Sequence, residues 1–491
     1  MRIPHQNQMH LDCVPIPQIQ LNTGCRHRII PVLRGLQHLY SQTSVMNQVL
    51  DLVEQDVSGN ANRDRGRKGM TYWQIMVLGA AKAGCDFTYD ELHDLAENHR
   101  NLRAMMQVGE WDNEHFKWSR IRDNLSLLRP ETVEKINHLV VGEGHRLEPT
   151  AAEAVRGDSF VCETNIHYPT ESSLIVDGLK KILALAPQLS ELIGFNGWRQ
   201  SKSLFRKAKR ANHELSRLKK GRNYQQRLQA GYEKLFHITD LILPRVQEML
   251  DAALDKLAGD KGGLSTGQET ELCQQLTYWQ AVTEHVINTA WRRVMEGEKV
   301  PNGDKLFSLF EPDTELLRRG KAAQPNQFGH QILVIEDAVG YICHYQVLKR
   351  DENDRDVLIE AVQILQARLN NRIQKASFDR GFHSEENQRK LAEILSHPCL
   401  PKPGRVQAAR QEEQATVEFR ESRQRHPGIE SAIGGLQSGN GLARCRDHSS
   451  VGYNRYVGLG VLGRNLFVLG KRLLQQEAPE SEAAASQRKA A

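Results

Sequence analysis

The sequence lacks several features that would assign a protein to a specialised class. No apolar run approaches the roughly 20 residues that a helix needs to cross a bilayer, which excludes a membrane-spanning protein. The first part of the chain has no continuous apolar segment of the kind found in signal peptides, so we expect the protein to stay in the cytoplasm. No internal repeat is visible either.

Cysteine is present, but not in a pattern that binds zinc. The eight cysteines include no CxxC pair, and no histidine cluster completes the spacing of a zinc site. In a large cytosolic chain we therefore expect reduced, mostly buried thiols, with neither disulfides nor a structural zinc ion.

The composition is that of an ordinary globular protein. Hydrophobic residues make up 39% and charged residues 25% of the 491 residues, which excludes a disordered chain. A chain of this length has room for roughly three domains. The net charge of +5 and the pI of about 8.7 are compatible with nucleic-acid binding, but the placement of basic residues says more than their sum.

The N-terminal part predicts an irregular arm at residues 1–29, followed by helices at residues 30–145. Thr88 and Glu91 form a capping box in front of one helix, and residues 115–128 form a further helical segment. Short helices joined by tight turns favour an all-α, helix-turn-helix-like DNA-binding domain.

Residues 150–474 predict an α/β domain that is interrupted by a helical insertion at about residues 174–320. One strand precedes the insertion, a hairpin follows it, and two further strands alternate with helices. The expected strands are 159–162, 331–336, 341–348, 373–378 and 398–401. Without the insertion, this order is the topology of a ribonuclease-H-like mixed sheet. The Ala-, Glu- and Ser-rich residues 475–491 predict a disordered tail.

Three acidic residues occur where this topology can form a metal site. Asp158 opens the first strand, Asp379 directly follows the strand after the hairpin, and Glu430 lies on a late helix. Carboxylates on separate elements can hold two Mg²⁺ ions (or Mn²⁺ in their place) roughly 3.5–4 Å apart. Such ions activate the attacking oxygen and stabilise the leaving one in phosphoryl transfer, with Asp158 as the expected bridging ligand.

Other interpretations of these acids remain open. An isolated Asp after a strand is more often a helix cap or a turn residue than a metal ligand. Four further acids could fill the same roles, namely Asp177, Asp337, Glu163 and Glu418.

Four blocks of sequence carry a family resemblance. They are GDSFVCETNIHYPTESSLIVDGLK (157–180), RRGKAAQPNQFGHQILVIEDAVGYI (318–342), SFDRGFHS (377–384) and HPGIESAIGGL (426–436). In this order they resemble the blocks of bacterial insertion-sequence DDE transposases of the ISNCY type, and the likeness extends over residues 30–474. The resemblance implies an enzyme that cleaves and joins DNA strands, with Asp158, Asp379 and Glu430 as its metal-binding catalytic triad.

The resemblance has consequences for residues around the triad. Glu163 and His167 belong to the first block and would support the metal site, although a hydrogen-bonded structural pair beside the strand is an equal alternative. Gln437 stands where many related transposases have Lys or Arg to hold DNA. Arg423 and His426 stand where some relatives have Tyr and Arg.

Two groups of basic residues are candidates for DNA contact. Lys117, Arg120 and Arg122 cluster on one short helix, where Arg can reach guanine edges and Lys can meet phosphates. The alternative is a solvated basic face with Trp118 in the core. The second group lies in the insertion, is opposed only by Glu214, and predicts salt-sensitive phosphate contact. Its members are Lys202, Arg206, Lys207, Lys209, Arg210, Arg217, Lys219, Lys220 and Arg222.

We therefore expect a Mg²⁺-dependent transposase that acts on double-stranded DNA, both as element ends and as target. It would be a homo-oligomer on DNA, because two ends must be brought together, and would work at the nucleoid in the cytoplasm without a membrane partner. A nuclease without strand transfer, a catalytically silent DNA-binding protein and a helical scaffold are the alternative functions.

Overall fold

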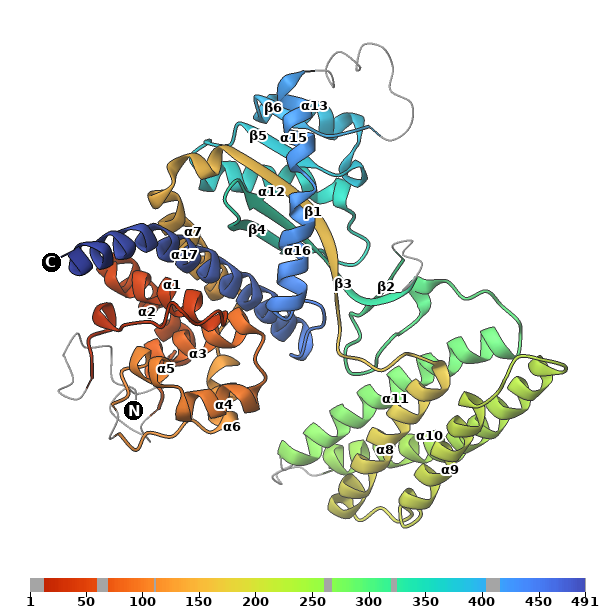
Figure 1. The fold of residues 1–491 in the computed structure, drawn as a ribbon. Coiled ribbons are helices and arrows are strands. Elements are labelled where there is room, and N and C mark those ends of the chain that lie inside the picture. Colours follow the sequence, from red (N-terminus) through yellow and green to blue (C-terminus); the bar gives the residue numbers. More distant parts are fainter. Residues whose placement is uncertain are drawn as a thin grey trace. The chain divides into compact units, whose positions relative to one another are not determined.

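The computed structural model divides into two compact units (Figure 1). Unit 1 consists of Met1–Asn165 and Gly329–Ala491, and unit 2 is Ile166–Phe328. Unit 2 thus falls in the part of the chain where the sequence predicted a helical insertion. The residues that the structure describes are 13–59, 69–109, 112–259, 267–318, 325–402 and 416–490.

The described N-terminal part of unit 1 is helical, as the sequence predicted. The capping box of Thr88 and Glu91 is present: Thr88 Oγ1 accepts a hydrogen bond from the Glu91 amide at 3.2 Å, and Glu91 Oε2 accepts one from the Thr88 amide at 2.7 Å. The helices are α1 (Ile29–Ser41), α2 (Thr43–Val57), α3 (Tyr72–Cys85), α4 (Tyr89–Asn98), α5 (Arg100–Met105), α6 (Trp118–Leu125) and α7 (Pro130–Leu147), with 3-10 turns at Ile16–Gln18 and Pro149–Glu153. Residues 1–12 of the expected arm lie outside the described residues.

One mixed sheet follows, with the strand order β2-β3-β1-β5-β6 and with β4 also paired to β3. β1 is antiparallel to β3 and parallel to β5, while β3 and β4 form the predicted hairpin. The strands are β1 (Ala154–Glu163), β2 (Glu315–Leu317), β3 (Gln327–Asp337), β4 (Ile342–Val347), β5 (Lys375–Phe378) and β6 (His397–Cys399). The five strands expected from the sequence are therefore confirmed.

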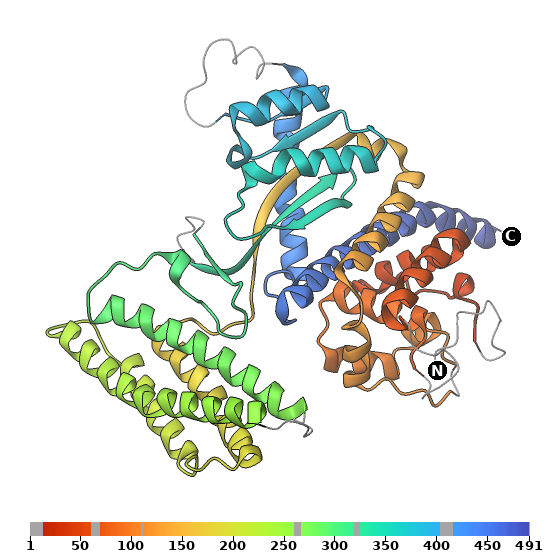
Figure 2. The same ribbon diagram turned by 180° about the vertical axis from the view of Figure 1, so that it is seen from behind.

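Helices cover both faces of this sheet. α12 (Asp354–Arg368) packs through Leu358 and Val362 into the core that holds Leu333 of β3. The opposite face carries Phe160 of β1 and packs against Ile429 of α16. Figures 1 and 2 show α16 and α12 on opposite sides of the strands. The remaining helices are η4 (Arg380–Phe382), α13 (Glu385–Ile394), α15 (Val417–Arg425), α16 (Gly428–Gly439) and α17 (Ser449–Ala490).

The N-terminal helices do not form a unit separate from the sheet. α17 packs so closely on α1 that a Cβ on Gly470 would lie 1.8 Å from the Pro31 carbonyl oxygen. A single hydrophobic core joins α1 and α3 to α17 and to the sheet. The sequence predicted a distinct domain at residues 30–145, because it could not show that the partner of α1 lies at the other end of the chain.

α17 also continues into residues 475–490, where the sequence predicted a disordered tail. Ala, Glu and Gln are good helix formers, so the composition of this segment alone does not distinguish a helix from a disordered tail.

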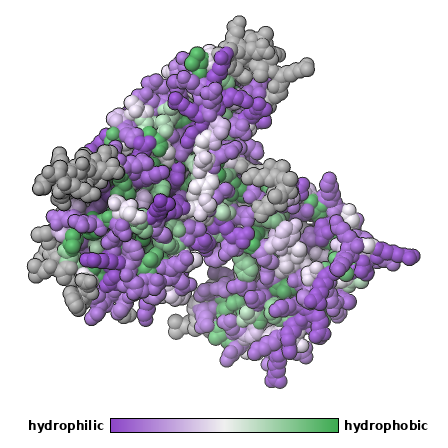
Figure 3. Space-filling model, in the orientation of Figure 1, coloured by the Kyte–Doolittle hydropathy of each residue, from purple (hydrophilic) through white to green (hydrophobic). Residues whose placement is uncertain are grey.

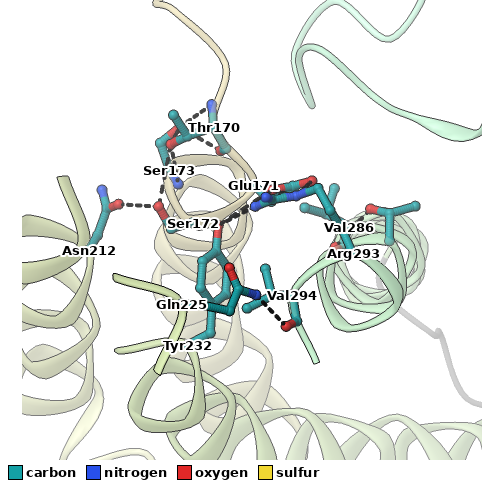
Figure 4. Close-up of polar contacts among 11 residues, drawn as sticks. Thr170, Glu171, Ser172, Ser173, Asn212, Gln225, Tyr232, Val286, Arg293 and Val294 are labelled. Atoms are coloured by element: carbon teal, nitrogen blue, oxygen red, sulfur yellow. Dashed lines mark hydrogen bonds and ion pairs between the residues drawn. The ribbon is translucent and has the colours of Figure 1, made fainter. Parts of the chain in front are cut away.

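Unit 2 is helical and has its own hydrophobic core, which includes Leu179, Leu235 and Leu276. At the start of α8, Thr170 and Ser173 form a capping box, and Glu171 accepts a hydrogen bond from Arg293 Nε at 2.7 Å (Figure 4). The elements are α8 (Glu171–Ile193), α9 (Ser201–Ser216), α10 (Tyr224–Gly259), α11 (Gly267–Val294) and the 3-10 turn Asn302–Asp304, and the short strand β2 also falls within unit 2.

The two ends of unit 2 leave neighbouring strands. Glu163 at the end of β1 is the register partner of Gly329 in β3. The strands approach closely there, since a Cβ on Gly329 would lie 2.1 Å from the Cys162 carbonyl oxygen. β1 and β3 are therefore still paired at the residues where the chain leaves unit 1 for unit 2 and returns from it.

Candidate functional site

Asp158 of β1 and Asp379, which directly follows the neighbouring parallel strand β5, occupy matching positions. Gly157 of β1 is the register partner of Phe378, the last residue of β5, and each aspartate is the next residue in its segment. Asp379 keeps an extended backbone, with φ −75° and ψ 167°. Adjacent strands are about 4.8 Å apart, so the backbones of the two aspartates are neighbours.

Both aspartates point to the face of the sheet that α15 and α16 cover. Asp158 is paired with Val334, which belongs to the hydrophobic core on the α16 side. Ser377, two residues before Asp379, bonds through its Oγ to His426 Nδ1 at 3.2 Å, just before α16 begins. Because side chains alternate along a strand, Asp379 shares the face of Ser377.

Glu430 lies in the first turn of α16, which runs alongside β1. Arg156 donates a hydrogen bond to the Arg425 carbonyl at 2.8 Å before the helix begins, and Gln437 Nε2 reaches the Val161 carbonyl at 3.4 Å near its end. α16 therefore runs in the direction of β1, and its first turns lie beside Asp158. Glu430 is seven residues before Gln437 and so projects from the same side of the helix. The structure brings the three predicted acids to one face of one sheet.

The three carboxylates are not packed into a tight cluster. Among the described residues, they do not form a group whose oxygen atoms all lie within 4.8 Å of one another. Asp379 and Glu430 are exposed, and Asp158 is half-buried, with its Oδ1 accepting a hydrogen bond from the Ser159 amide at 2.7 Å. A site for two ions roughly 3.5–4 Å apart does not require all three carboxylates to meet at one point.

Charged groups around the aspartates are held in place by ion pairs. Arg156 pairs with the buried Glu336 at 2.6 Å. Burial raises the pKa of Glu336, although the charge of Arg156 opposes that shift. Burial has the opposite effect on the imidazole of His426 and lowers its pKa, while the negative charge of the Asp379 carboxylate opposes that shift. His426 is therefore a neutral neighbour of Asp379 at neutral pH.

The other acids considered from the sequence lie elsewhere. Asp177 is in α8 and pairs with His167 at 3.4 Å, while Glu163 pairs with Arg444 at 3.0 Å. Glu163 and His167 thus have different partners, and neither pairing involves the three acids. Asp337 ends β3 in a buried contact with His145 at 2.8 Å, and Glu418 is half-buried in the first turn of α15.

A second group of potential metal ligands was not predicted from the sequence. His145 of α7, Asp337 of β3 and Cys343 of β4 are buried together, and they are the only described group of three such residues whose ligand atoms all lie within 4.8 Å. Burial raises the pKa of the Cys343 thiol well above its usual value. No spacing rule could find this group, because its members come from three elements and His145 is distant in sequence from the other two.

The basic residues on α6 are largely engaged by other side chains. Arg120 pairs with Glu114 at 3.2 Å, and Arg122 pairs with Asp123 at 2.8 Å while lying over the ring of Trp118. Trp118 is 45% exposed and not in the core. Lys117 occupies the N-cap position of the helix without a side-chain capping hydrogen bond and is exposed. This group can still contact DNA, but two of its cations already have acidic partners.

The basic residues on α9 are different, because all five are exposed. Ala208, Ala211 and Leu215 form the buried side of α9, and the basic side chains occupy the other side. Within the described residues, none of the five forms an ion pair; they are Lys202, Arg206, Lys207, Lys209 and Arg210. The further basic residues from Arg217 to Arg222 follow the helix and are also exposed. Figure 3 shows that hydrophilic residues cover most of the visible surface.

Comparisons of the chain with known protein families, with curated proteins and with solved structures found no match. In the described part of the chain, none of the helices combines the length and the apolar character needed to span a membrane.

Proposed function

We propose that the chain is a DDE-type transposase of the ISNCY type, which cleaves and joins DNA strands with Asp158, Asp379 and Glu430. The observation that carries the proposal is the convergence of these three acids. Asp158 on β1 and Asp379 directly after the parallel strand β5 occupy matching positions, and Glu430 lies on the helix that covers the same face. Three of the four sequence blocks that resemble transposase blocks each supply one of them.

The sheet supports the same proposal. A central β1 with an antiparallel hairpin on one side and two parallel strands on the other is the order of a ribonuclease-H-like sheet. In this arrangement the predicted insertion follows the first strand, as unit 2 does here. The N-terminal helices and α9 would bind the element ends and the target, and two or more copies would hold two ends together.

The donor set of the site fits Mg²⁺, because all three side chains offer hard carboxylate oxygens. When bound, two such ions would activate the attacking oxygen and stabilise the leaving one. Asp158, Asp379 and Glu430 would hold these ions through their carboxylate oxygens. Arg156 and His426 position α16 against the strands through their contacts with Arg425 and Ser377.

The proposal is tested by incubating the purified protein with Mg²⁺ and a plasmid that carries the sequences flanking its gene. We expect cuts at the element ends and joined products. Asp158→Asn, Asp379→Asn and Glu430→Gln should each lower the rate by about 100-fold or more while leaving DNA binding intact. Glu360→Gln is the matched control, because Glu360 is exposed on α12, on the opposite face of the sheet.

The products distinguish the alternative functions. Metal-dependent cuts without joined products would indicate a nuclease. Binding without cleavage in the wild-type protein would indicate a catalytically silent DNA-binding protein. Cleavage that survives all three triad substitutions would overturn the proposed site.

A further inference from the structure

Three potential ligands from separate elements meet in the core of unit 1. His145 Nε2 lies 2.8 Å from Asp337 Oδ2, and Cys343 Sγ lies 3.6 Å from the same oxygen and 3.9 Å from the same nitrogen. All three residues are buried, with the side chains of His145 and Asp337 only 3% and 0% exposed.

The three atoms are close enough to bind one small transition-metal ion. An ion in their plane would lie about 2.0 Å from each, and displacement out of the plane toward a fourth ligand lengthens these distances into the range of zinc bonds, about 2.0–2.2 Å to nitrogen and oxygen and about 2.3 Å to sulfur. The mixed nitrogen, oxygen and sulfur set favours zinc over Mg²⁺, which binds oxygen ligands.

The carboxylate of Asp337 is already held in the orientation that ligation needs. Its Oδ1 accepts hydrogen bonds from the amides of Val339, Gly340 and Tyr341 at 2.8–3.0 Å. These bonds close the β3–β4 turn and leave Oδ2 directed at His145 and Cys343. Hydrogen bonds that orient a metal-binding carboxylate in this way are a regular feature of metal sites.

A second observation concerns His145 itself. Its Nδ1 is buried and has no hydrogen-bond partner among the described residues, which is costly for a polar atom. An adjoining cavity of about 400 Å³ is lined by His145 and Cys343. It has room for water, which can serve the imidazole and supply the fourth ligand of a tetrahedral site.

We propose that His145, Asp337 and Cys343 bind one zinc ion, with a water molecule as the fourth ligand. The ion fastens α7 to the β3–β4 hairpin, and so joins the N-terminal helices to the sheet. This site is separate from the three acids of the proposed transposase, and it does not depend on that function.

The test measures metal, not DNA cleavage. The untagged full-length protein is purified from zinc-supplemented medium, and its zinc content is determined by mass spectrometry. We expect one zinc ion per chain in the wild type, and much less than one in Cys343→Ser. Cys273→Ser is the matched control, because it removes a buried thiol from unit 2 and should keep the zinc.

Cobalt replacement reports on the ligands directly. Wild-type protein reconstituted with Co²⁺ should show a thiolate-to-cobalt charge-transfer band that Cys343→Ser lacks, and Asp158→Asn should keep both the band and the zinc. Wild-type protein without zinc and without this band would overturn the proposal. So would Cys343→Ser protein that keeps a full equivalent of zinc. A negative result in this test would not count against the proposed transposase activity, and a negative result in the cleavage assay would not count against the zinc site.

Discussion

His344 shows how one buried residue can make the stability of unit 1 depend on pH. It lies in β4, is 5% exposed, and is surrounded by Arg368, Glu134 and His138. Burial, assisted by the charge of Arg368, lowers its pKa to about 4. The folded protein therefore keeps this imidazole neutral at pH values where the unfolded chain, with a pKa near 6.5, takes up a proton.

Because the folded-state pKa is depressed, the contribution of His344 to stability is present above pH 6.5 and is lost as the pH falls toward 4. We predict that this residue alone lowers the free energy of unfolding by about 2 kcal/mol between pH 6.5 and pH 5. Urea unfolding of wild type and His344→Leu at both pH values measures this, since the variant cannot take up the proton. Equal losses of stability in the two proteins would contradict the prediction.

At the scale of elements, α9 is the strongest candidate for contact with DNA. Its basic side chains are exposed and lack acidic partners among the described residues, whereas Arg120 and Arg122 of α6 are already paired. Unpaired cations release counterions when they meet phosphates, and paired ones contribute less.

We predict that replacing Lys202, Arg206 and Lys209 with Gln weakens DNA binding and makes it less sensitive to salt. The slope of log affinity against log salt should fall by up to about 3, which is one for each phosphate that the variant no longer neutralises. Titration of labelled DNA at several salt concentrations measures both effects. The matched control replaces three ion-paired surface cations, namely Lys349, Arg389 and Lys390. If the α9 variant behaves like this control, α9 is only a solvated surface.

Apart from the three-residue strand β2, which was not expected, the elements of the sheet domain could be predicted from sequence because each carries its own local signal. Short apolar, β-rich runs define β1 and β3, and Asp337 to Gly340 define the turn of the hairpin. Asp158, Asp379 and Glu430 could be singled out for two reasons. Their places in the predicted order of strands and helices suit a metal site, and they lie in sequence blocks that resemble those of DDE transposases. The His145–Asp337–Cys343 group could not, since it depends on how α7 packs against the hairpin, and no local pattern encodes that packing.

In the whole molecule, too, packing between distant parts of the chain could not be predicted from the sequence. The packing of α1 on α17 joins the two ends of the chain, so the N-terminal helices belong to unit 1 and not to a domain of their own. Unit 2, by contrast, was visible in the sequence as a long, charged helical segment between two strands. It has a core of its own.

We predict that unit 1 folds without unit 2. Since Glu163 and Gly329 are register partners, residues 164–328 can be replaced by an Asn-Gly turn that joins β1 to β3 as a hairpin. The shortened protein should keep a folded sheet by circular dichroism and should unfold in one thermal transition, where the full chain shows two. A shortened protein that does not fold would mean that unit 1 requires contacts with unit 2.

The position of unit 2 between β1 and β3 also has a consequence for folding kinetics. While unit 2 is unfolded, pairing β1 with β3 must close a long loop, which costs about 3 kcal/mol more than closing a short turn. Once unit 2 has folded and drawn its ends together, most of that cost is removed. β1 leaves the ribosome before unit 2, and β3 leaves after it. A mutation that slows the folding of unit 2 would therefore leave the strand that bears Asp158 unpaired during synthesis, exposed to pairing with other chains.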